Sequence, residues 1–528
     1  MDNPIGPASA EVRWVPEAAV RTILCLALTC SGLLAQHPSV EEGALRAHLA
    51  FLADDVLEGR GTGQRGGELA VRYLETQLQV LGLQPANGSS YRQAVRLAGV
   101  RLDPAASGLT FEGPTGLLAP ALGTDLVMGA AGAEASLAVD APLVFVGHGI
   151  TAEGRDDYKG LDVRGKILVM LVGDRKGGSP MPLCCQPENY QGRWTYKFEE
   201  ARRRGAAGAL LVHTDASAGY GWTVVRNSWS GERFQRADSG QAGAVQGWIT
   251  EAFATRLFAS VGQDFRRLAA AADGRDFRPV PLPLRAQGTL RSAVRSLDQW
   301  NVAGLVPGTD PALRDGCVIY SAHGDHFGKG ADGAIYAGAV DNATGCAAVL
   351  ALAQAVAARP FPRSALFLFP CGEEQGLLGS SAYVAAPLVS QAKTRLVINL
   401  ESLNVVGPTR DIGLLGSGDA ATRLLCARAA AATGLVITPA KADPAGLCFR
   451  SDHFPFMQAG VPALSPGFSL DGGWDYLGDQ AAAQAKAAAF MNHYHRPSDR
   501  YDPAWNLEGL LQQVRFTLEL GRLAGSER

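Results

Sequence analysis

The chain has 528 residues, of which 47% are hydrophobic and 19% are charged, and its formal net charge is -3 at pH 7. A chain of this length is long enough for two or more domains, each with its own core. The near-neutral balance and the absence of a block of Lys and Arg argue against a nucleic-acid or anionic-membrane partner.

An apolar stretch near the amino terminus is typical of a secretory signal. Arg21 precedes Thr22–Ala35, a stretch that has the length of a signal-peptide core and is too short to span a bilayer. Cleavage is plausible before Gln36. We therefore expect residues 1–35 to be a signal peptide, and the mature protein to be secreted or periplasmic without stable membrane insertion. An uncleaved anchor and a lipoprotein at Cys30 are the alternatives.

The cysteines do not indicate a metal site. Nine are present, and removal of Cys25 and Cys30 with the signal leaves seven. Because seven is odd, at least one thiol is free or pairs with another molecule. Cys184 and Cys185 are adjacent, and nothing in the sequence says what either pairs with. No Cys-x-x-Cys pair occurs, so a cysteine zinc site is not supported.

Residues 36–95 have a helical pattern. From His48 to Leu83 apolar residues recur at roughly helical spacing, on either side of the glycine-rich Leu57-Glu-Gly-Arg60-Gly-Thr-Gly63. Gly82 ends the pattern. From residue 85 to about 140 only short strand candidates occur.

Residues 96–290 are expected to form an insertion, with a core at about 140–270. Its elements are the apolar strands Leu143–Val146 and Lys166–Val172, a helix over Tyr196–Gly205 and a strand over Gly208–His213. A strand, a helix that ends in Gly and a further strand form a small α/β unit. Residues 270–292, with three prolines, are predicted to be the linker out of the insertion.

Residues 291–528 alternate strands and helices. The predicted strands are Cys317–Tyr320, Leu366–Phe369 and Leu396–Leu400. The predicted helices between and after them are Ala343–Ala358 and Leu424–Ala432. This alternation predicts an α/β fold, a mostly parallel mixed sheet flanked by helices on both faces.

Metal-competent side chains follow three of these strands and open one helix. They are His323, Asp325, His326, Asp341, Glu373, Glu374 and Glu401. The carboxyl ends of parallel strands meet at one edge of a sheet, where ligands bind. Imidazole and carboxylate without thiolate suit Zn, with Mn or Co as substitutes. A carboxylate-rich set suits two ions, because a bridging carboxylate offsets adjacent dications. A further ligand is needed downstream, and His453 and His495 are both candidates.

Five motifs resemble those of the co-catalytic zinc aminopeptidase family. They are Ser-Ala-His-x-Asp-His-x-Gly, Asp-Asn-x-x-Gly, Gly-Glu-Glu-x-Gly-Leu-x-Gly-Ser, Arg-Ser-Asp-His-x-x-Phe and Tyr-His-x-Pro-x-Asp. This family also contains glutamate carboxypeptidase, the transferrin receptor and, more distantly, glutaminyl cyclase. The resemblance runs from about residue 45 to the end, and the β-rich insertion is similar to a protease-associated domain. It implies a zinc-peptidase fold for residues 36–95 and 291–528.

The resemblance also implies roles for individual residues. It assigns His323 and Glu401 to one zinc, Glu374 and His495 to the other, and Asp341 to both. It makes Glu373 the general base that takes a proton from the zinc-activated water, and Asp325 the residue that orients the imidazole of His323. In this family the peptide bond between Asp341 and Asn342 is often cis.

Two positions depart from the family pattern. Asp is usual where this chain has Glu401, and many relatives have a Tyr near Cys448 that donates to the oxyanion. Tyr494 is our first candidate for that donor and Arg450 the second. We expect the substrate pocket to involve Arg450, Asp452 and His453.

The predicted function is therefore an exported zinc aminopeptidase that acts on peptides with a free amino terminus. A carboxypeptidase or a dipeptidase is the main alternative. A non-catalytic receptor-like protein would have lost metal ligands, whereas every expected position here carries a competent side chain. A glutaminyl cyclase is a further alternative, although such relatives generally lack the insertion. No pattern indicates an oligomeric state.

Overall fold

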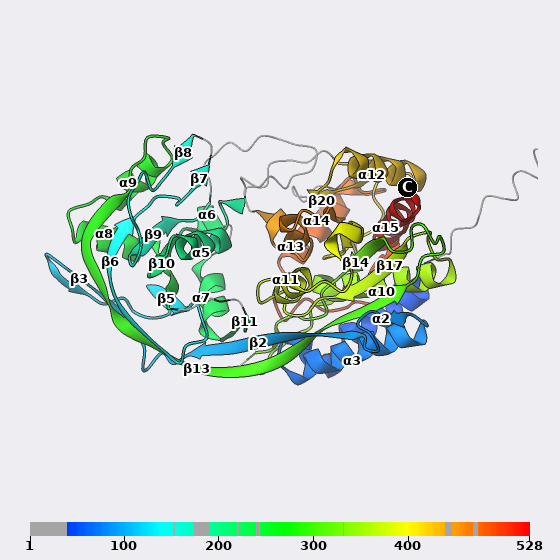
Figure 1. Cartoon of the computed structure of the whole chain (residues 1–528), viewed down its shortest axis with the longest axis horizontal. Helices are drawn as coiled ribbons and strands as arrows, with labels where there is room; N and C mark the ends of the chain where they lie inside the picture. Colours follow the sequence, from blue (N-terminus) through cyan, green and yellow to red (C-terminus); the bar gives the residue numbers. More distant parts are fainter. Residues whose placement is uncertain are drawn as a thin grey trace, which may run out of the picture. The chain divides into compact units, whose positions relative to one another are not determined.

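The computed structural model describes residues 40–528, except 153, 174–189, 219–220, 239, 241–242, 331, 439–445 and 468–473. The predicted signal peptide and the adjacent Cys184 and Cys185 lie outside the described residues. Within them the chain has the predicted α/β architecture (Figure 1).

A mostly parallel sheet forms the centre of the carboxyl-terminal part. Its strands β14 (Cys317–Ser321), β17 (Ser364–Phe369) and β18 (Thr394–Asn399) are parallel to one another. The edge beyond β18 consists of the parallel β22 (Ala463–Pro466) and the antiparallel β20 (Leu414–Ser417). The three predicted strands are confirmed, and their ends differ from the prediction by at most two residues.

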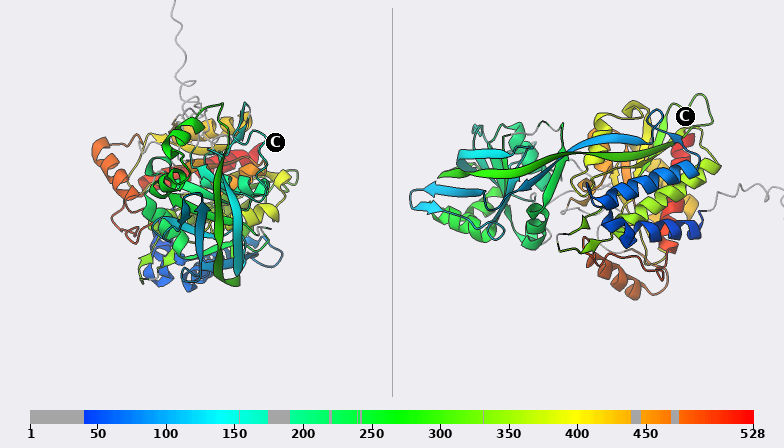
Figure 2. Two further views of the ribbon diagram at one scale, coloured as in Figure 1. Left: turned by 90° about the vertical axis from the view of Figure 1, so that its left-hand side faces the viewer. Right: turned by 90° about the horizontal axis from the view of Figure 1, so that it is seen from below.

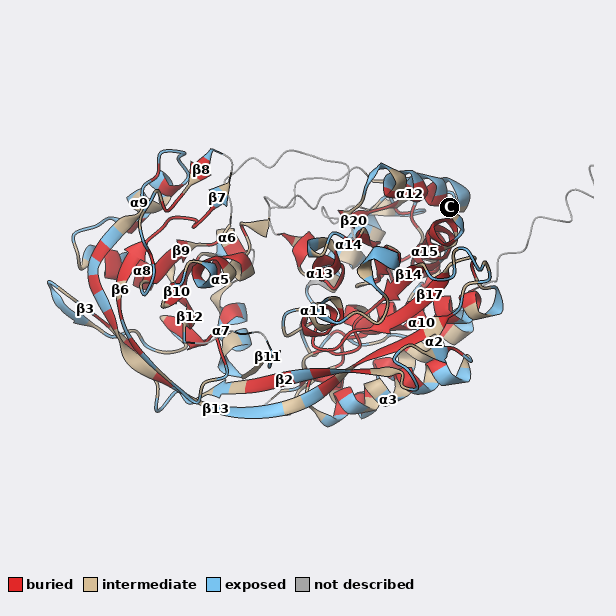
Figure 3. Cartoon of the chain, in the orientation of Figure 1, coloured by how far each residue is buried: buried red, intermediate tan, exposed pale blue. Residues whose placement is uncertain are grey.

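Helices cover both faces of this sheet, which explains why its strands are apolar on both sides (Figure 3). On one face Tyr320 and Phe367 pack against helices. These helices are α2 (Glu42–Leu52), α3 (Arg65–Val80), α10 (Thr344–Ala358), α12 (Ala420–Thr433) and α15 (Glu508–Ser526). On the other face Ile319 packs with α11 (Leu378–Ala385) and α13 (His453–Gln458). In the right-hand view of Figure 2 the blue α2 and α3 lie beside the yellow-green α10.

The helix α10 is the most enclosed helix of this layer. Small residues dominate it, and nearly all of them are buried between α2 and the strands. With the preceding turn η3 (Ala339–Ala343) it forms the one helix among the described residues that is long and apolar enough to cross a membrane. However, 89% of its apolar window is buried inside the protein.

The insertion contains its own sheet with helices on both faces. Its strands run in the order β6 (Ser136–Phe145), β9 (Ile167–Leu171), β10 (Gly208–His213), β12 (Val245–Thr250) and β5 (Leu126–Ala130), and all are parallel except β5. Apolar residues of α8 (Glu251–Ala259) and α9 (Phe265–Ala272) pack on one face. Those of α5 (Trp194–Arg203) and α7 (Trp222–Ser230) pack on the other. The predicted strand–helix–strand unit is thus present.

One long strand belongs to both sheets. The strand β13 (Val280–Val306) pairs with β6 near its beginning and with β17 near its end. Between these contacts it pairs with β2 (Arg92–Leu102). The expected domain boundaries near 95 and 291 therefore fall inside paired strands.

The prediction of a linker over residues 270–292 is wrong. Most of this segment is the first half of β13, and α9 covers its beginning. Pro281 and Pro283 suggested irregular chain, but the strand shifts register between Leu282 and Arg285. A bulge of this kind is where a strand tolerates proline, because the ladder hydrogen bonds are interrupted there.

Close packing of α15 on β14 predicts a large effect of a small substitution. A Cβ atom at Gly521 would lie 1.6 Å from Oη of Tyr320. Gly521→Ala should therefore lower the free energy of unfolding by about 1–3 kcal/mol or more, although Ala favours helix. Urea denaturation measures the change.

Gly43→Ala in α2 is the matched control, because a Cβ at Gly43 would meet nothing within 4 Å. It should leave stability unchanged or raise it slightly. Equal effects of the two substitutions would contradict the packing described for α15.

Candidate metal centre and active site

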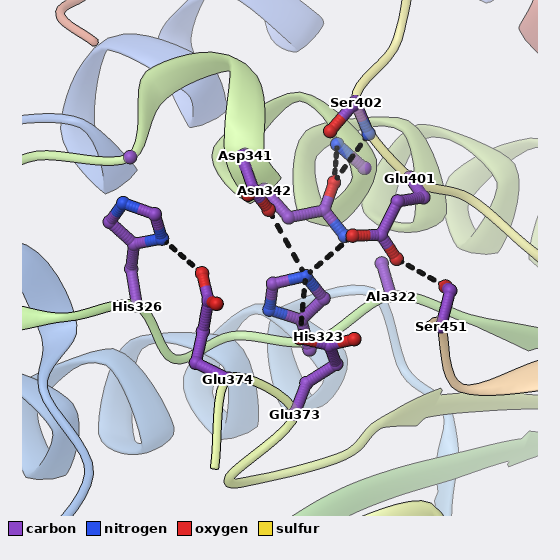
Figure 4. Close-up of polar contacts among 12 residues, drawn as sticks. Ala322, His323, His326, Asp341, Asn342, Glu373, Glu374, Glu401, Ser402 and Ser451 are labelled. Carbon is purple, nitrogen blue, oxygen red and sulfur yellow. Dashed lines mark hydrogen bonds and ion pairs between the residues drawn. The ribbon is translucent and has the colours of Figure 1, made fainter. Parts of the chain in front are cut away.

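The sheet edge brings the predicted metal ligands together. His323 follows β14, Glu373 and Glu374 follow β17, and Glu401 follows β18. Asp341 lies in η3, and its peptide bond to Asn342 is cis. In Figure 4 the interactions drawn from His323 lead to Asp341, Glu373 and Glu401.

Two groups of side chains share Asp341. In the first group, Nε2 of His323 lies 3.1 Å from Oε1 of Glu401 and 3.3 Å from Oδ1 of Asp341. In the second group, Nε2 of His495 lies 3.1 Å from Oδ2 of Asp341 and 3.4 Å from Oε2 of Glu374. Each oxygen of Asp341 thus faces a different imidazole, which is the arrangement of a bridging carboxylate.

These distances, 3.1–3.4 Å, are close to the separation of two ligands of one divalent ion. Nitrogen and oxygen ligands at 2.0–2.2 Å from a tetrahedral zinc ion are about 3.3–3.6 Å apart. Oδ1 of Asp341 is also buried without a hydrogen bond of good geometry to any residue that the structure describes. A buried carboxylate oxygen without a donor is costly unless a cation approaches it. The five side chains could therefore hold two metal ions.

The electrostatics of the site favour cations. Burial raises the pKa of Glu373 well above its ordinary value, and the charges of Glu401 and Glu374 act in the same direction. Burial opposes the charged form of His323, but Glu401 and Glu373 raise its pKa well above the ordinary value. Burial would also raise the pKa of Asp341, but its interactions with His323 and His495 hold that pKa well below the ordinary value. The carboxylates outnumber the imidazoles that compensate them.

The adjacent Glu373 and Glu374 have different surroundings. Oε2 of Glu373 is 3.9 Å from Nε2 of His323, further than the ligand oxygens of either group. The backbone N–H of Glu373 donates to Oδ1 of Asp325 at 3.2 Å. Glu373 lies close enough to His323 and Glu401 to share an ion with them, but its carboxylate is further from Nε2 of His323 than those of Asp341 and Glu401.

Asp325 contacts His323 differently from the prediction. Nδ1 of His323 lies 3.0 Å from the backbone oxygen of Asp325, whereas the carboxylate of Asp325 is 4.0 Å away. The carboxylate instead accepts hydrogen bonds from Glu373 and from Oγ1 of Thr62. Asp325 orients the imidazole through its carbonyl and the Glu373 loop through its carboxylate.

The sequence prediction assigned no role to His326. Its side chain is fully buried, and Nδ1 lies 2.5 Å from Oε1 of Glu374 (Figure 4). This separation is that of a hydrogen bond, and it is shorter than the separation expected for two atoms that bind one ion. His326, Asp341 and Glu374 lie close enough to hold an ion, but the contact of His326 with Oε1 of Glu374 makes His495 the better candidate ligand. His326 stands three residues after His323 in the same motif, and this spacing is the sequence signal that could have indicated its role.

Ser451 and Asp499 also support ligands. Oγ of Ser451 donates to Oε2 of Glu401, which leaves the other oxygen to face His323. The carboxylate of Asp499 accepts from the backbone N–H groups of Val340 and Asp341 and holds that turn.

Tyr494 lies beside the second group. Its ring stacks on His495 with centroids 3.7 Å apart, and 44% of the side chain is exposed. Despite this exposure, desolvation beside the second group and the charges of Asp341 and Glu374 raise the pKa of Tyr494 well above its ordinary value. The hydroxyl therefore remains protonated and can donate a hydrogen bond.

The three expected pocket residues differ in exposure. Arg450 is half-buried, and its charge acts on Tyr494. Asp452 and His453 are fully buried, so they can shape the wall of the site but have no surface for direct contact with substrate. Asp452 accepts a hydrogen bond from Oγ of Ser380 at 2.5 Å, and burial raises its pKa to about 7.

The described cysteines take no part in the metal groups. Cys448 forms a disulfide. The free thiols are Cys317, Cys346, Cys371 and Cys426. All four are buried, as is typical of structural cysteines.

Comparisons with known proteins agree with the fold. Residues 301–516 match the model of Peptidase family M28. No curated protein matches the chain. A solved aminopeptidase from Aneurinibacillus sp. strain AM-1 is 19% identical, with a TM-score of 0.53 and coverage of 93% of this chain and 95% of that one. At this identity the likeness supports the fold alone.

Two further solved structures show weaker likeness. A zinc aminopeptidase from Bacillus subtilis is 16% identical, with a TM-score of 0.48 and coverage of 93% of this chain and 97% of that one. A peptidase M28 precursor from Shewanella amazonensis SB2B is 19% identical, with a TM-score of 0.46 and coverage of 96% and 98%.

The buried His453 predicts a pH dependence of stability. Burial lowers its pKa to about 4, from an ordinary value of 6.5. The unfolded chain therefore binds this proton more readily, so the contribution of the neutral imidazole is complete above about pH 6.5 and is lost as the pH falls towards 4. The loss should reach about 3 kcal/mol, at 1.36 kcal/mol for each pKa unit.

Urea denaturation of chelator-treated protein between pH 7 and pH 4.5 measures this dependence without metal release. His453→Gln should lose less stability on acidification than the wild type. Parallel pH profiles for the two proteins would show that the buried imidazole is not the cause.

Proposed function

Because residues 301–516 form a domain of peptidase family M28, as the motifs predict, we propose that the protein is a zinc aminopeptidase. It removes amino-terminal residues from peptides with a free amino terminus. The observation that carries the proposal is the pair of ligand groups that share Asp341, with Glu373 held beside them. The aminopeptidase from Aneurinibacillus, which has a similar fold, is consistent with this activity.

Two zinc ions are the proposed cofactors. His323 and Glu401 would hold one ion, His495 and Glu374 the other, and Asp341 both. Manganese or cobalt could substitute for zinc with these ligands. When bound, the ions supply Lewis acidity that polarises the scissile carbonyl and lowers the pKa of water.

Glu373 is the proposed general base. It accepts a proton from the attacking water and passes it to the amine that leaves. Burial and the neighbouring carboxylates raise its pKa, which favours temporary retention of that proton. The hydrogen bond from its backbone N–H to Asp325 fixes the loop that presents it.

Tyr494 is the proposed donor to the oxyanion. Its hydroxyl remains protonated and lies near the carboxylates of both groups. A donor that is already oriented stabilises charge as it develops in the transition state. Arg450, whose charge acts on Tyr494, is the second candidate.

Export and the nature of the insertion are also part of the proposal. The apolar stretch Thr22–Ala35 would direct the protein out of the cytoplasm. The insertion would be a protease-associated domain, and its position before His323 and its alternation of strands and helices support this.

Assays with paired peptides test the activity. The zinc-loaded protein should hydrolyse amino-acid nitroanilides and peptides with a free amino terminus, and should not cleave the same peptides after N-acetylation. Cleavage of the blocked peptides from the carboxyl end would establish the carboxypeptidase alternative instead. Cyclisation of an amino-terminal glutamine without hydrolysis would establish a glutaminyl cyclase.

The adjacent carboxylates provide a matched pair of variants. Glu373→Gln should retain two zinc ions and lose about 10²–10⁴-fold in kcat, because only the proton carrier is removed. Glu374→Gln should lose zinc, because Oε2 of Glu374 belongs to the second ligand group. Zinc content by mass spectrometry and turnover of a nitroanilide measure the two effects. Near wild-type turnover of Glu373→Gln would make its assignment as the base wrong.

A further inference from the structure

Arg60 is a buried cation to which the proposed mechanism gives no role. It lies in the glycine-rich Leu57–Gly63 segment, at the end of η2 (Asp55–Arg60), and only 1% of its surface is exposed. Glu58, Gly59 and Arg60 all have positive φ, between 48° and 70°. A Cβ at Gly59 would lie 2.3 Å from the backbone oxygen of Tyr336. The chain therefore adopts a disfavoured conformation that turns the guanidinium inward.

The guanidinium binds backbone carbonyls. Nε donates to Gly324 at 3.0 Å, Nη1 donates to Leu52 at 2.5 Å and to Ala337 at 2.6 Å, and Nη2 donates to Gly338 at 2.8 Å. Among the residues that the structure describes, no carboxylate lies within ion-pair distance of Arg60. An arginine that is buried without a carboxylate partner is unusual, so its contacts require a specific explanation.

These carbonyls belong to the loops that carry metal ligands. Gly324 directly follows His323, and Gly338 comes shortly before Asp341 in the chain. The backbone oxygen of Arg60 also accepts from the N–H of His326 at 3.2 Å, and the side chain of His326 holds Glu374. One residue thus connects the supports of three predicted ligands.

The positive charge of Arg60 also complements the carboxylates of the site. The negative charges of Asp499, Asp325 and Asp341 stabilise the buried guanidinium, while burial lowers its pKa. A fixed positive charge close behind a carboxylate-rich site reduces the repulsion among the carboxylates. It does so without occupying any ligand position.

We propose that Arg60 is a positioning residue that fixes the loop after β14 against the turn before α10, so that His323 and Asp341 are arranged for metal before any metal binds. This inference rests on the proposed metal centre. Lysine should not replace Arg60, because its three donors radiate from one nitrogen, whereas the planar guanidinium donates along several fixed directions.

Arg60→Lys tests the proposal, with Arg155→Lys as the matched control. Arg155 is another buried arginine, but it binds Asp157 and the carbonyl of Ala272 in the insertion. We expect zinc affinity, measured by competition with a chromogenic chelator, to fall about 10–100-fold in Arg60→Lys, as on loss of residues that orient metal ligands. Arg155→Lys should lower the melting temperature and leave zinc affinity unchanged.

Wild-type zinc affinity in a folded Arg60→Lys protein would overturn the proposal. An equal loss of affinity in Arg155→Lys would also overturn it, because the effect would then follow general destabilisation. Absence of zinc binding by the wild-type protein would instead refute the proposed metal centre, so the two failures are distinguishable.

Hydrogen exchange on the wild-type protein decides the question if Arg60→Lys does not fold. Peptides that cover 322–326 and 337–343 should already be protected in the metal-free protein, with less than a tenfold further slowing on addition of zinc. Rapid exchange of both segments without zinc, followed by strong protection with zinc, would show that the metal and not Arg60 arranges these loops.

Discussion

Mutual repulsion among buried carboxylates is the constraint on which the site depends. Asp341 and Glu373 are buried within one cluster that also includes Glu374 and Glu401, and the two imidazoles of the ligand groups compensate only part of the charge. A protein tolerates such a cluster when a cation or a shared proton is available. The proposed function uses both solutions, because the metal ligands face cations and Glu373 carries the proton.

The parallel sheet brings these carboxylates and imidazoles together. The carboxyl ends of its parallel strands lie at one edge, and the apolar layers on both faces hold that edge rigid. Three of the proposed ligands are restrained by a further contact: His326 holds Glu374, Ser451 holds Glu401, and the carbonyl of Asp325 holds His323. Restraints of this kind fix the orientation of metal ligands and their affinity for the ion.

The strands of the sheet were predictable because continuous apolar runs mark them, whereas the full set of proposed ligands came from the resemblance to the aminopeptidase motifs. His323, Glu374 and Glu401 come shortly after apolar runs, Asp341 opens a helix, and the motif around His495 supplied the distant candidate. The hydrogen bonds that hold the proposed ligands in place could not be predicted from the sequence. Hydrogen bonds such as that from Ser451 to Glu401 join residues 50 positions apart, and no local periodicity encodes them. The continuous β13 was missed because its prolines resemble those of a linker, whereas a register shift accommodates them.

Anomalous scattering at the zinc edge from crystals of the zinc-loaded protein tests the central claim most directly. The account predicts two peaks about 3.5–4 Å apart, the separation typical of paired catalytic metals. One peak should lie between His323 and Glu401, the other between His495 and Glu374, and Asp341 should contact both. A single peak, or a peak bound to Nδ1 of His326 in place of His495, would contradict the shared-carboxylate centre.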